Sequence, residues 1–284
     1  MTQTRRLSSG LINRQRPLNF EFDGKKFSGY QGDTLASALL ANGVQLMGRS
    51  FKYHRPRGPF TSGSEEPNAI VELREGARKE PNTRATTIEL YDDLIAKSQN
   101  RWPSLGFDMM AVNDLFSNFL TAGFYYKTFM WPAAFWEKLY EPIIRRAAGL
   151  GSASLEADPD CYDKGFLHCD LLIIGAGAAG LAAALVAGRA GLDVILADED
   201  FVIGGRLNQE SFSIDDQSGS AFAASTYEEL ASLPNVKIMT RTTVIGAFDH
   251  GVYALVERVA DHFKVPADGQ PRQRLWRVYS QSAL

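Results

Sequence analysis

Alternating apolar and polar residues near the start of the chain predict two strands. From Leu18 to Phe22 every second residue is apolar, which is the period of a strand with one buried face. The following Asp23-Gly24 pair is a strong signal for a tight turn, and Phe27 continues the apolar pattern beyond it. We therefore expect a β-hairpin over residues 18–30.

A short helix is expected directly after the hairpin. The segment Leu35–Gly43 is rich in Leu and Ala, Asp33 or Thr34 can cap its first turn, and its final glycine can end it in the left-handed conformation. A hairpin followed by a helix is typical of the opening of a β-grasp domain of the ubiquitin-like or ferredoxin-like type. Residues 69–74 and 86–90 are the further strands that we expect in this domain.

The segment before these later strands, residues 48–68, is rich in Gly, Pro, Ser and Arg, and we expect it to be a loop. We interpret Glu65-Glu66 as a charged turn rather than an acid/base pair. His54 stands among basic residues, and we interpret it as facing solvent, with a phosphate contact as the alternative.

Residues 101–150 form an aromatic segment with 12 of the chain's 31 Phe, Trp and Tyr residues. Spacings of three and four recur, which predicts helices, interrupted at Pro132 and Pro142. The rings either pack between flanking domains or form an apolar interface with another subunit. Residues 149–165 have the composition of a linker. The rings concerned include Phe116, Phe119, Phe124, Tyr125, Tyr126, Phe129, Trp131, Phe135, Trp136 and Tyr140.

The second half of the chain predicts a strand, a glycine-rich turn, a helix and a second strand, in the order of a Rossmann-like βαβ unit. These elements cover His168–Ile174, Gly175–Gly191 and Asp193–Asp198. Later strands are expected at Val236–Met239, Thr243–Phe248, Gly251–Arg258 and Arg274–Val278.

The glycine-rich turn has the spacing and the setting of a dinucleotide-binding motif, because it follows an apolar strand and opens an alanine-rich helix. Gly175 would make the tight turn, Gly177 would let the backbone approach a pyrophosphate, and Gly180 would let the helix pack against the sheet. Free N–H groups and the helix dipole would bind the phosphates. The candidate binding residues are Gly175, Ala176, Gly177, Ala178, Ala179 and Gly180.

Acidic residues follow the second strand of this unit. Asp198 stands 18 residues after Gly180, and a carboxylate there can accept hydrogen bonds from the adenosine ribose. Together with Glu199 and Asp200 it would repel a 2′-phosphate, which favours NAD or FAD over NADP. Asp198 and Glu199 are therefore candidate cofactor-binding residues.

A second glycine pair, Gly204-Gly205, is expected to bring a loop against the dinucleotide, as in flavin- and pyridine-nucleotide-disulfide-reductase-like folds. Arg206 would then either contact a phosphate or lie at the surface. Val244, on a later strand, completes the candidate cofactor-binding residues.

Composition and charge narrow the class of protein. A length of 284 residues allows two domains, and 45% hydrophobic with 22% charged residues is ordinary for a globular protein. The net charge of −3 excludes a global basic field for nucleic acid. Residues 1–58 nevertheless hold 10 Lys and Arg against 3 Asp and Glu, so the N-terminal module is basic. It either docks onto an acidic partner or is a solvated basic surface.

Metal, membrane and side-chain catalytic signals are weak. The two cysteines, Cys161 and Cys169, are too few for a zinc or iron–sulfur site, and we expect reduced thiols in a cytoplasmic protein. The histidines lack metal-binding spacing, and no serine stands in a nucleophile-elbow motif. The most apolar stretch, residues 109–136, is interrupted by polar residues and falls short of the ~18–20 apolar residues of a membrane span.

Several segments together resemble the N-terminal part of the α subunits of bacterial heterotetrameric sarcosine oxidases, over about residues 10–278. The most specific of these segments are Arg49–Gly58 and the aromatic run, because the glycine motif occurs in many families. The segments are Gly32–Gly43, Arg49–Gly58, Glu72-Leu73, the aromatic run through Trp131-Pro132, and Gly175–Gly205.

The resemblance implies an oxidoreductase assembly that converts sarcosine to glycine and hydrogen peroxide. The N-methyl carbon would leave as formaldehyde or, with tetrahydrofolate, as 5,10-methylenetetrahydrofolate. The β subunit would carry FAD, FMN and the amine-oxidising site, and γ and δ subunits would complete the heterotetramer. The α subunit would bind NAD through the positions that are Gly175, Gly177, Gly180 and the acids at 198–199 here, and it would supply no catalytic residue.

Some relatives of this family carry a [2Fe–2S] cluster on a C-x4-C-x2-C motif after an Arg-Pro-Arg-Gly-like turn. The corresponding positions of this sequence are Thr61, Glu66 and Ala69, none of which is a thiolate ligand. The expectation is therefore a cluster-free ferredoxin-like domain.

The expected fold class is α/β with an α+β N-terminal part. A basic arm over residues 1–16 precedes a cluster-free β-grasp domain over 17–100, and an aromatic helical connector and linker follow over 101–165. A Rossmann-like FAD/NAD(P)-binding βαβ domain over 166–284 is expected to be incomplete, because chains of the family continue beyond its sheet. The alternatives are a stand-alone FAD-dependent oxidoreductase and a non-catalytic assembly module.

Overall fold

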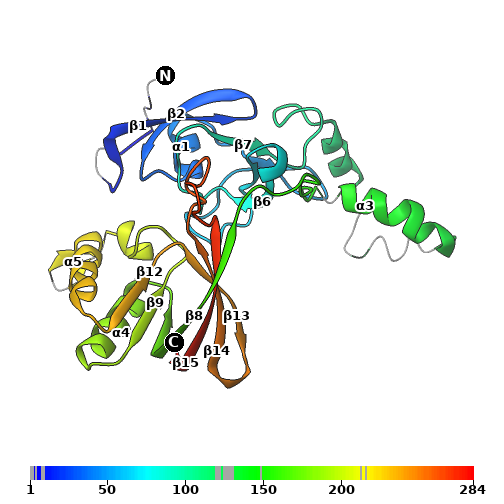
Figure 1. The fold of residues 1–284 in the computed structure, drawn as a ribbon. Helices are drawn as coiled ribbons and strands as arrows, with labels where there is room; N and C mark the ends of the chain where they lie inside the picture. The colour runs from blue at the N-terminus through cyan, green and yellow to red at the C-terminus, as the bar shows by residue number, and fades with distance from the viewer. Residues whose placement is uncertain are drawn as a thin grey trace. The chain divides into compact units, whose positions relative to one another are not determined.

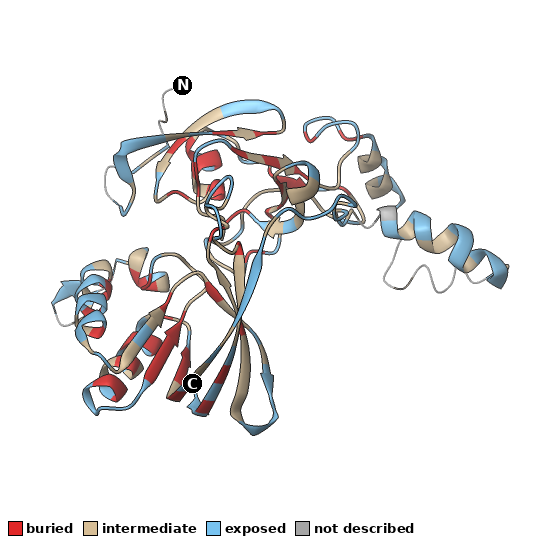
Figure 2. Cartoon of the chain, in the orientation of Figure 1, coloured by how far each residue is buried: buried red, intermediate tan, exposed pale blue. Residues whose placement is uncertain are grey.

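A computed structural model describes residues 3, 5–7, 10–118, 123, 131–147, 149–211, 213–214 and 216–284. The chain divides into two compact units, Met1–Pro159 (unit 1) and Asp160–Leu284 (unit 2). Each unit has its own apolar core, and Figure 2 shows the buried residues of each in red.

Unit 1 is built on a five-stranded mixed sheet in the order β2-β1-β7-β5-β6 (Figure 1). The predicted hairpin is confirmed, with β1 antiparallel to β2 and the turn at Asp23-Gly24. The elements of unit 1 are β1 Asn13–Phe22, β2 Lys25–Gln31, α1 Leu35–Ala41, β3 Gly48–Arg49, β4 Pro56–Arg57, β5 Ile70–Leu73, β6 Glu80–Arg84, β7 Leu94–Ser98 and α3 Glu141–Ala147, with 3-10 turns at Gly76–Arg78, Met109–Phe116 and Ala133–Phe135 and a π-helical turn at Trp136–Tyr140.

Thr34 caps α1, so of the two predicted capping residues, Asp33 and Thr34, the structure selects the second. The Thr34 hydroxyl accepts the Ser37 N–H at 3.1 Å, and the Ser37 hydroxyl accepts the Thr34 N–H at 3.0 Å. This reciprocal capping box satisfies N–H groups that the first helical turn leaves without partners. The helix buries Leu35 and Leu39 completely in the unit 1 core.

The strand expected at residues 86–90 is wrong. This segment instead forms backbone hydrogen bonds with the start of α1. The Ile88 carbonyl accepts the Leu35 N–H at 2.9 Å, and the Leu90 N–H donates to the Asp33 carbonyl at 2.9 Å. The apolar residues of this segment reach the core from an irregular backbone, while β6 and β7 form on either side of it. The expected loop at 48–68 also contains the short β3–β4 pair.

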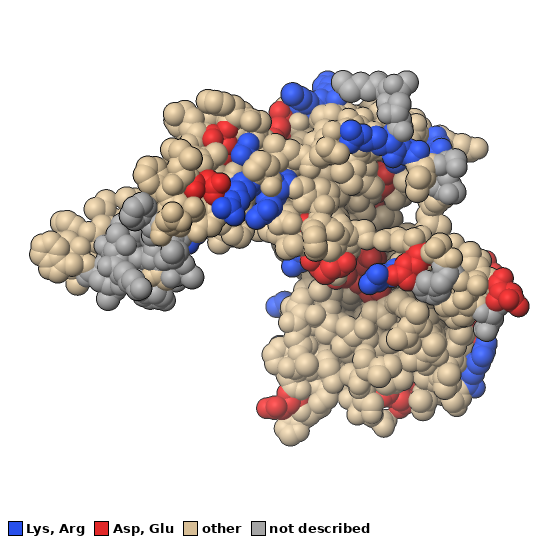
Figure 3. Space-filling model, turned by 180° about the vertical axis from the view of Figure 1, so that it is seen from behind, with Lys and Arg blue, Asp and Glu red and all other residues tan. Residues whose placement is uncertain are grey.

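Part of the expected basic arm folds back onto unit 1. The guanidinium of Arg6 donates to both oxygens of the fully buried Asp33, at 2.9 and 2.5 Å, and lies over the ring of Tyr30. Figure 3 shows groups of Lys and Arg side chains on the surface of unit 1.

The aromatic segment is only partly covered by the structure. Phe119, Phe124, Tyr125, Tyr126 and Phe129 lie outside the described residues. Trp131 and Phe135 are exposed, at 83% and 48% of their surface.

The predicted helix break at Pro142 is wrong, because the π-helical turn Trp136–Tyr140 runs directly into α3 and the chain stays helical through this proline. The helix changes from π to α at Glu141 instead of ending.

Unit 2 is built on a six-stranded sheet in the order β12-β9-β8-β15-β14-β13. β12, β9, β8 and β15 are parallel, and β15, β14 and β13 are antiparallel, so the predicted strands of this half are confirmed. The elements are β8 Tyr162–Ile174, α4 Ala178–Arg189, β9 Val194–Ala197, β10 Ser213–Ile214, β11 Gln217–Ser218, α5 Gly219–Ser232, β12 Val236–Met239, β13 Thr242–Phe248, β14 Val252–Arg258 and β15 Gln273–Ala283, with 3-10 turns at Gly205–Asn208 and Asp249–Gly251.

Two buried clusters lie on unit 2. One joins α4 and α5 to the parallel strands through residues such as Ile173, Leu196 and Leu230. The other joins Leu172 and Ile195 of these strands to Leu255 of the antiparallel part. β15 runs from Gln273 to Ala283, longer than the strand predicted at 274–278, and it pairs with β8 along its length. These contacts fix the carboxyl ends of β8 and β9, where the candidate site lies.

Candidate functional site

The glycine-rich turn connects the end of β8 to the start of α4. Gly175 has a φ of +100°, a conformation that L side chains rarely adopt, and its N–H donates to the Ala197 carbonyl at 2.8 Å. This bond holds the turn beside the carboxyl end of β9. The turn therefore lies at the edge where ligands bind to open α/β sheets.

Gly180 and Gly177 meet very different surroundings. A Cβ at position 180 would lie 1.9 Å from the carbonyl oxygen of Gly175, so only glycine allows the helix to approach the strand this closely. A Cβ at position 177 would meet no atom within 4 Å. Packing within the protein accounts for Gly180, whereas the space at Gly177 is open to a ligand.

The start of α4 provides N–H groups for an anion. Gly177 is the N-cap residue, and no side chain caps the helix. The first hydrogen bond of the helix runs from the Leu181 N–H to the Gly177 carbonyl at 2.9 Å. The N–H groups before Leu181 lie outside this ladder, and Ala178 and Ala179 are exposed. The helix dipole adds partial positive charge at the same place.

Asp198 supports the turn from the end of β9. Its Oδ2 accepts the Ala176 N–H at 2.5 Å, and its Oδ1 accepts the Asp200 N–H at 2.8 Å. Burial raises the pKa of this carboxyl above its usual range, the two backbone N–H groups act in the opposite direction, and the charge of Glu199 raises it further. The carboxylate thus both fixes the turn and stands beside it with lone pairs to spare.

The second glycine pair lies against the first motif. The Gly204 N–H donates to the Ala176 carbonyl at 2.8 Å, and a Cβ at position 205 would lie 3.5 Å from the Gly177 Cα. Gly204 has a φ of +115°. The structure therefore brings both glycine segments and Asp198 together at one edge of the sheet.

The remaining candidates lie elsewhere or serve another contact. Arg206 is paired with Glu210 at 2.8 Å, and its side chain is 86% exposed. Val244 packs against the buried cluster that joins Leu172 and Ile195 to Leu255. The Glu199 carbonyl accepts a hydrogen bond from the Arg258 guanidinium.

Glu66 is a buried polar anchor, a role that the sequence pattern did not indicate. The residue is only 1% exposed. Its Oε2 accepts the N–H groups of Phe60 and Thr61 at 2.6 Å each. Its Oε1 accepts the N–H groups of Asn68 and Ala69 at 2.7 and 3.1 Å. Burial alone would raise the pKa of this carboxyl, but the four backbone N–H groups outweigh it and hold the pKa below the usual range. The prediction of a charged turn is corrected to that of a buried loop anchor.

His54 is buried, which corrects the prediction of a solvent-facing histidine. The residue is 3% exposed, and its Nδ1 lies 2.6 Å from Oδ2 of the buried Asp108. The Asp108 carboxylate also lies 3.7 Å from Arg49 Nε. Within the residues that the structure describes, no group of three or more His, Cys, Asp or Glu side chains could hold a metal ion. No helix of the same part of the chain could cross a membrane.

Two family descriptions match the chain. Residues 15–101 match the family described as a 2Fe-2S iron-sulfur cluster binding domain, and residues 170–259 match FAD dependent oxidoreductase. The first match covers most of unit 1's sheet, and the second covers the glycine turn and β9.

Curated relatives cover the whole chain. It is 59% identical over 284 residues to sarcosine oxidase subunit alpha of Rhizobium meliloti (strain 1021), of which it spans 29%. It is 31% identical to the protein of the same name from Corynebacterium sp. (strain U-96), of which it spans 26%. The chain thus spans less than a third of the length of these relatives.

A solved structure shares the fold. L-proline dehydrogenase from P. horikoshii aligns with 95% of this chain and 40% of its own, with a TM-score of 0.54 and 19% identity.

The family match corrects the expected fold class and cofactors. Residues 15–101 match a 2Fe-2S cluster binding family, which contradicts the description of this domain as cluster-free, and the match of residues 170–259 indicates FAD where NAD was expected. Such clusters are held by cysteine thiolates. Both cysteines of this sequence, at 161 and 169, lie outside residues 15–101, and the amides of the 60–69 loop donate to Glu66. The side chains of the matched range do not fit a thiolate-held cluster, and we assign none of them as a ligand.

Proposed function

Because all 284 residues of this chain align with sarcosine oxidase subunit alpha at 59% identity, we propose that the chain is the dinucleotide-binding N-terminal part of a subunit of that kind. Its role is to hold the ADP half of a dinucleotide at the edge formed by β8, β9 and the start of α4. It contributes to an oxidoreductase as a subunit, and the amine-oxidising residues lie on another part of the assembly.

The open space at Gly177 is the observation that carries this proposal. Gly180 is explained by packing, but nothing within the described protein fills the space beside Gly177, which faces the start of α4. A pyrophosphate there would receive N–H groups from the first helical turn. Asp198 has one accepted hydrogen bond on each oxygen, which leaves acceptor capacity for the ribose hydroxyls.

FAD and NAD share the ADP half that this geometry suits. The match to an FAD-dependent family favours FAD. NAD is the alternative, because the resemblance to sarcosine oxidase α subunits implies it. Three adjacent acids at 198–200 disfavour a 2′-phosphate in either case.

The assembled protein, in this proposal, oxidises sarcosine to glycine with hydrogen peroxide as the other product. The methyl carbon leaves as formaldehyde or as 5,10-methylenetetrahydrofolate. β, γ and δ subunits are the proposed partners, and the cytoplasm is the proposed compartment. A stand-alone FAD enzyme and a non-catalytic assembly module are the other outcomes that an experiment can return.

The test is to denature the purified chain, identify any released nucleotide by mass spectrometry, and titrate FAD and NAD into the nucleotide-free chain. We expect binding of one of them, and we expect Gly177→Ala to weaken it about tenfold or more, because the added methyl group occupies the pyrophosphate's place. Gly106→Ala is the matched control, since its Cβ also meets no atom within 4 Å but lies in unit 1.

Asp198→Ala should weaken the same binding by about 1–3 kcal/mol, as expected for the loss of a charged hydrogen-bond partner. Unchanged affinity in Gly177→Ala, with the wild-type chain binding, would contradict the assignment of this site. Assembly with partner subunits in the absence of any nucleotide binding would leave the assembly-module function in its place.

A further inference from the structure

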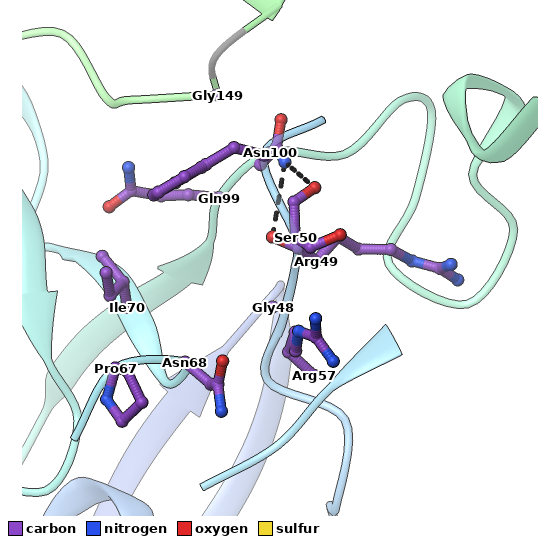
Figure 4. Close-up of a pocket in the computed structure, with 11 residues that line it drawn as sticks. Gly48, Arg49, Ser50, Arg57, Pro67, Asn68, Ile70, Gln99, Asn100 and Gly149 are labelled. Carbon is purple, nitrogen blue, oxygen red and sulfur yellow. Dashed lines mark hydrogen bonds between the residues drawn. The ribbon is translucent and has the colours of Figure 1, made fainter. Parts of the chain in front are cut away.

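We propose that unit 1 carries a second binding site, for a small oxyanion, in a cavity lined by Arg57 and Asn68 (Figure 4). The cavity has a volume of about 160 Å³ and lies between the β3–β4 pair, the loop before β5, and residues 99–100. The ligand class is a carboxylate or an inorganic phosphate. The site shares no residue with the dinucleotide site of unit 2 and does not depend on it.

Arg57 is a half-buried cation without a counter-ion. In the described part of the chain its side chain has no hydrogen bond and no ion pair, although buried charges in proteins are normally paired. Its main chain is fixed, because the Arg57 carbonyl accepts the Met47 N–H at 2.9 Å. A guanidinium fork held at a cavity wall is suited to the two oxygens of an oxyanion.

Arg49, the second arginine that lines the cavity, has its hydrogen-bonding and charge partners within the protein. Arg49 donates to the Leu105 carbonyl at 2.7 Å and to the His54 carbonyl at 2.9 Å, and it lies 3.7 Å from the buried Asp108 carboxylate. Its charge is thus compensated within the protein. That of Arg57 is not, so the cavity keeps a net positive charge.

Asn68 supplies the second polar group. Its backbone N–H is already held by Glu66 at 2.7 Å, which positions the residue, whereas its half-buried side-chain amide has no protein partner among the described residues. Figure 4 shows the Asn68 amide and the Arg57 guanidinium on neighbouring walls of the cavity, from the loop before β5 and from β4. A side-chain amide and a guanidinium that line the same cavity offer donors to more than one oxygen of an anion.

The rest of the lining fits the same class of ligand. None of the described residues that line the cavity is acidic, so nothing there repels an anion. Asn100 is not available, because its amide donates to the Ser50 carbonyl at 2.6 Å. A cavity of roughly 150 Å³ holds a molecule about the size of benzene, which admits acetate or phosphate and excludes a nucleotide.

The test uses the full chain with ¹⁵N labelling and three probes: acetate, inorganic phosphate and acetamide, the neutral isostere of acetate. We expect saturable NMR shifts of the Asn68 side-chain amide and the Arg57 Nε–H with at least one anion, and none with acetamide. A stronger response to acetate identifies a carboxylate site, and a stronger response to phosphate identifies a phosphate site.

Arg57→Gln should weaken the anion binding about tenfold or more, because it removes the charge and one arm of the fork. Arg55→Gln is the matched control, since Arg55 is exposed, paired with Asp114 at 2.7 Å, and does not line the cavity. Asn68→Ala, which keeps the backbone N–H to Glu66, should give a smaller loss and covers the case in which Arg57→Gln does not fold. The absence of a saturable shift with either anion, equal binding of acetamide, or unchanged affinity in both variants would overturn the proposal.

Discussion

Glu66 of unit 1 and Asp198 of unit 2 are two buried or half-buried carboxylates that both accept backbone N–H groups, yet their pKa values move in opposite directions. Four N–H groups from both ends of the loop hold the pKa of Glu66 below its usual range against the effect of burial. Burial raises the pKa of Asp198, and its two N–H groups do not offset this. The number of donors set against the degree of desolvation therefore decides the direction in which each pKa is shifted.

The same count separates a structural role from a binding role. Each carboxylate oxygen has two acceptor positions in its plane. In Glu66 both oxygens accept two N–H groups, so this carboxylate is saturated by its own loop. In Asp198 each oxygen accepts one, so each keeps acceptor capacity beside the glycine turn that it supports. We infer that Glu66 closes a loop, whereas Asp198 is left with acceptors for a ligand.

The largest expected effect is a loss of stability on substitution of Gly180. The glycine turn of unit 2 depends on the close packing of this residue as well as on Asp198. Gly180→Ala should lower the free energy of unfolding of unit 2 by about 3 kcal/mol or more, because its Cβ would lie 1.9 Å from the Gly175 carbonyl. Urea unfolding followed by circular dichroism measures this loss. Gly177→Ala is the control and should change stability by less than about 0.5 kcal/mol. Equal losses in the two variants would remove the distinction between packing glycine and ligand-facing glycine.

Glu66→Gln should have the next largest effect, at about 2–3 kcal/mol on the opening of its loop. The amide oxygen can still accept two N–H groups, but its N–H₂ group would face the other two donors and leave them without an acceptor. Amide hydrogen exchange at Ala69 and along β5 reports this opening. The matched change Asp198→Asn leaves fewer donors without a partner and should cost about 1 kcal/mol at the turn after β9. A larger loss from Asp198→Asn than from Glu66→Gln would break the comparison.

The smallest effect, and the one that tests the sign, is the dependence of stability on pH. The pKa of Glu66 is lowered on folding, so its stabilisation is present above the unfolded pKa and is lost as pH falls through the folded pKa. The pKa of Asp198 is raised, so its contribution is present below the unfolded pKa and is lost as pH rises through the folded pKa. Between about pH 3 and 6, where carboxyl groups titrate, the difference in unfolding free energy from wild type should grow with pH for Glu66→Gln. For Asp198→Asn it should not grow. The same slope in both would show that the two carboxyls are not shifted in opposite directions.

The elements that depend on near neighbours in the sequence were predictable. The hairpin at Asp23-Gly24, the capping of α1 by Thr34, and the strand-turn-helix at Gly175 are encoded by period, turn residues and capping side chains a few positions apart. The strand expected at 86–90 was wrong, because Leu35 and Asp33 of the helix start compete for the same backbone groups. The sequence pattern carries no record of that competition.

The sequence determined by itself the N-terminal hairpin and helix, the strand-turn-helix-strand order of residues 168–198, the glycine spacing at residues 175–180 and the acid that follows the next strand. That these residues bind a dinucleotide stays a prediction. Only the tertiary structure decided that Glu66 is saturated and Asp198 is not, that His54 meets Asp108 in the interior, and that Arg57 has no counter-ion in the described chain. The physical reason is that hydrogen-bond capacity and desolvation are set by atoms brought together from distant positions, and a residue's neighbours in sequence do not fix them.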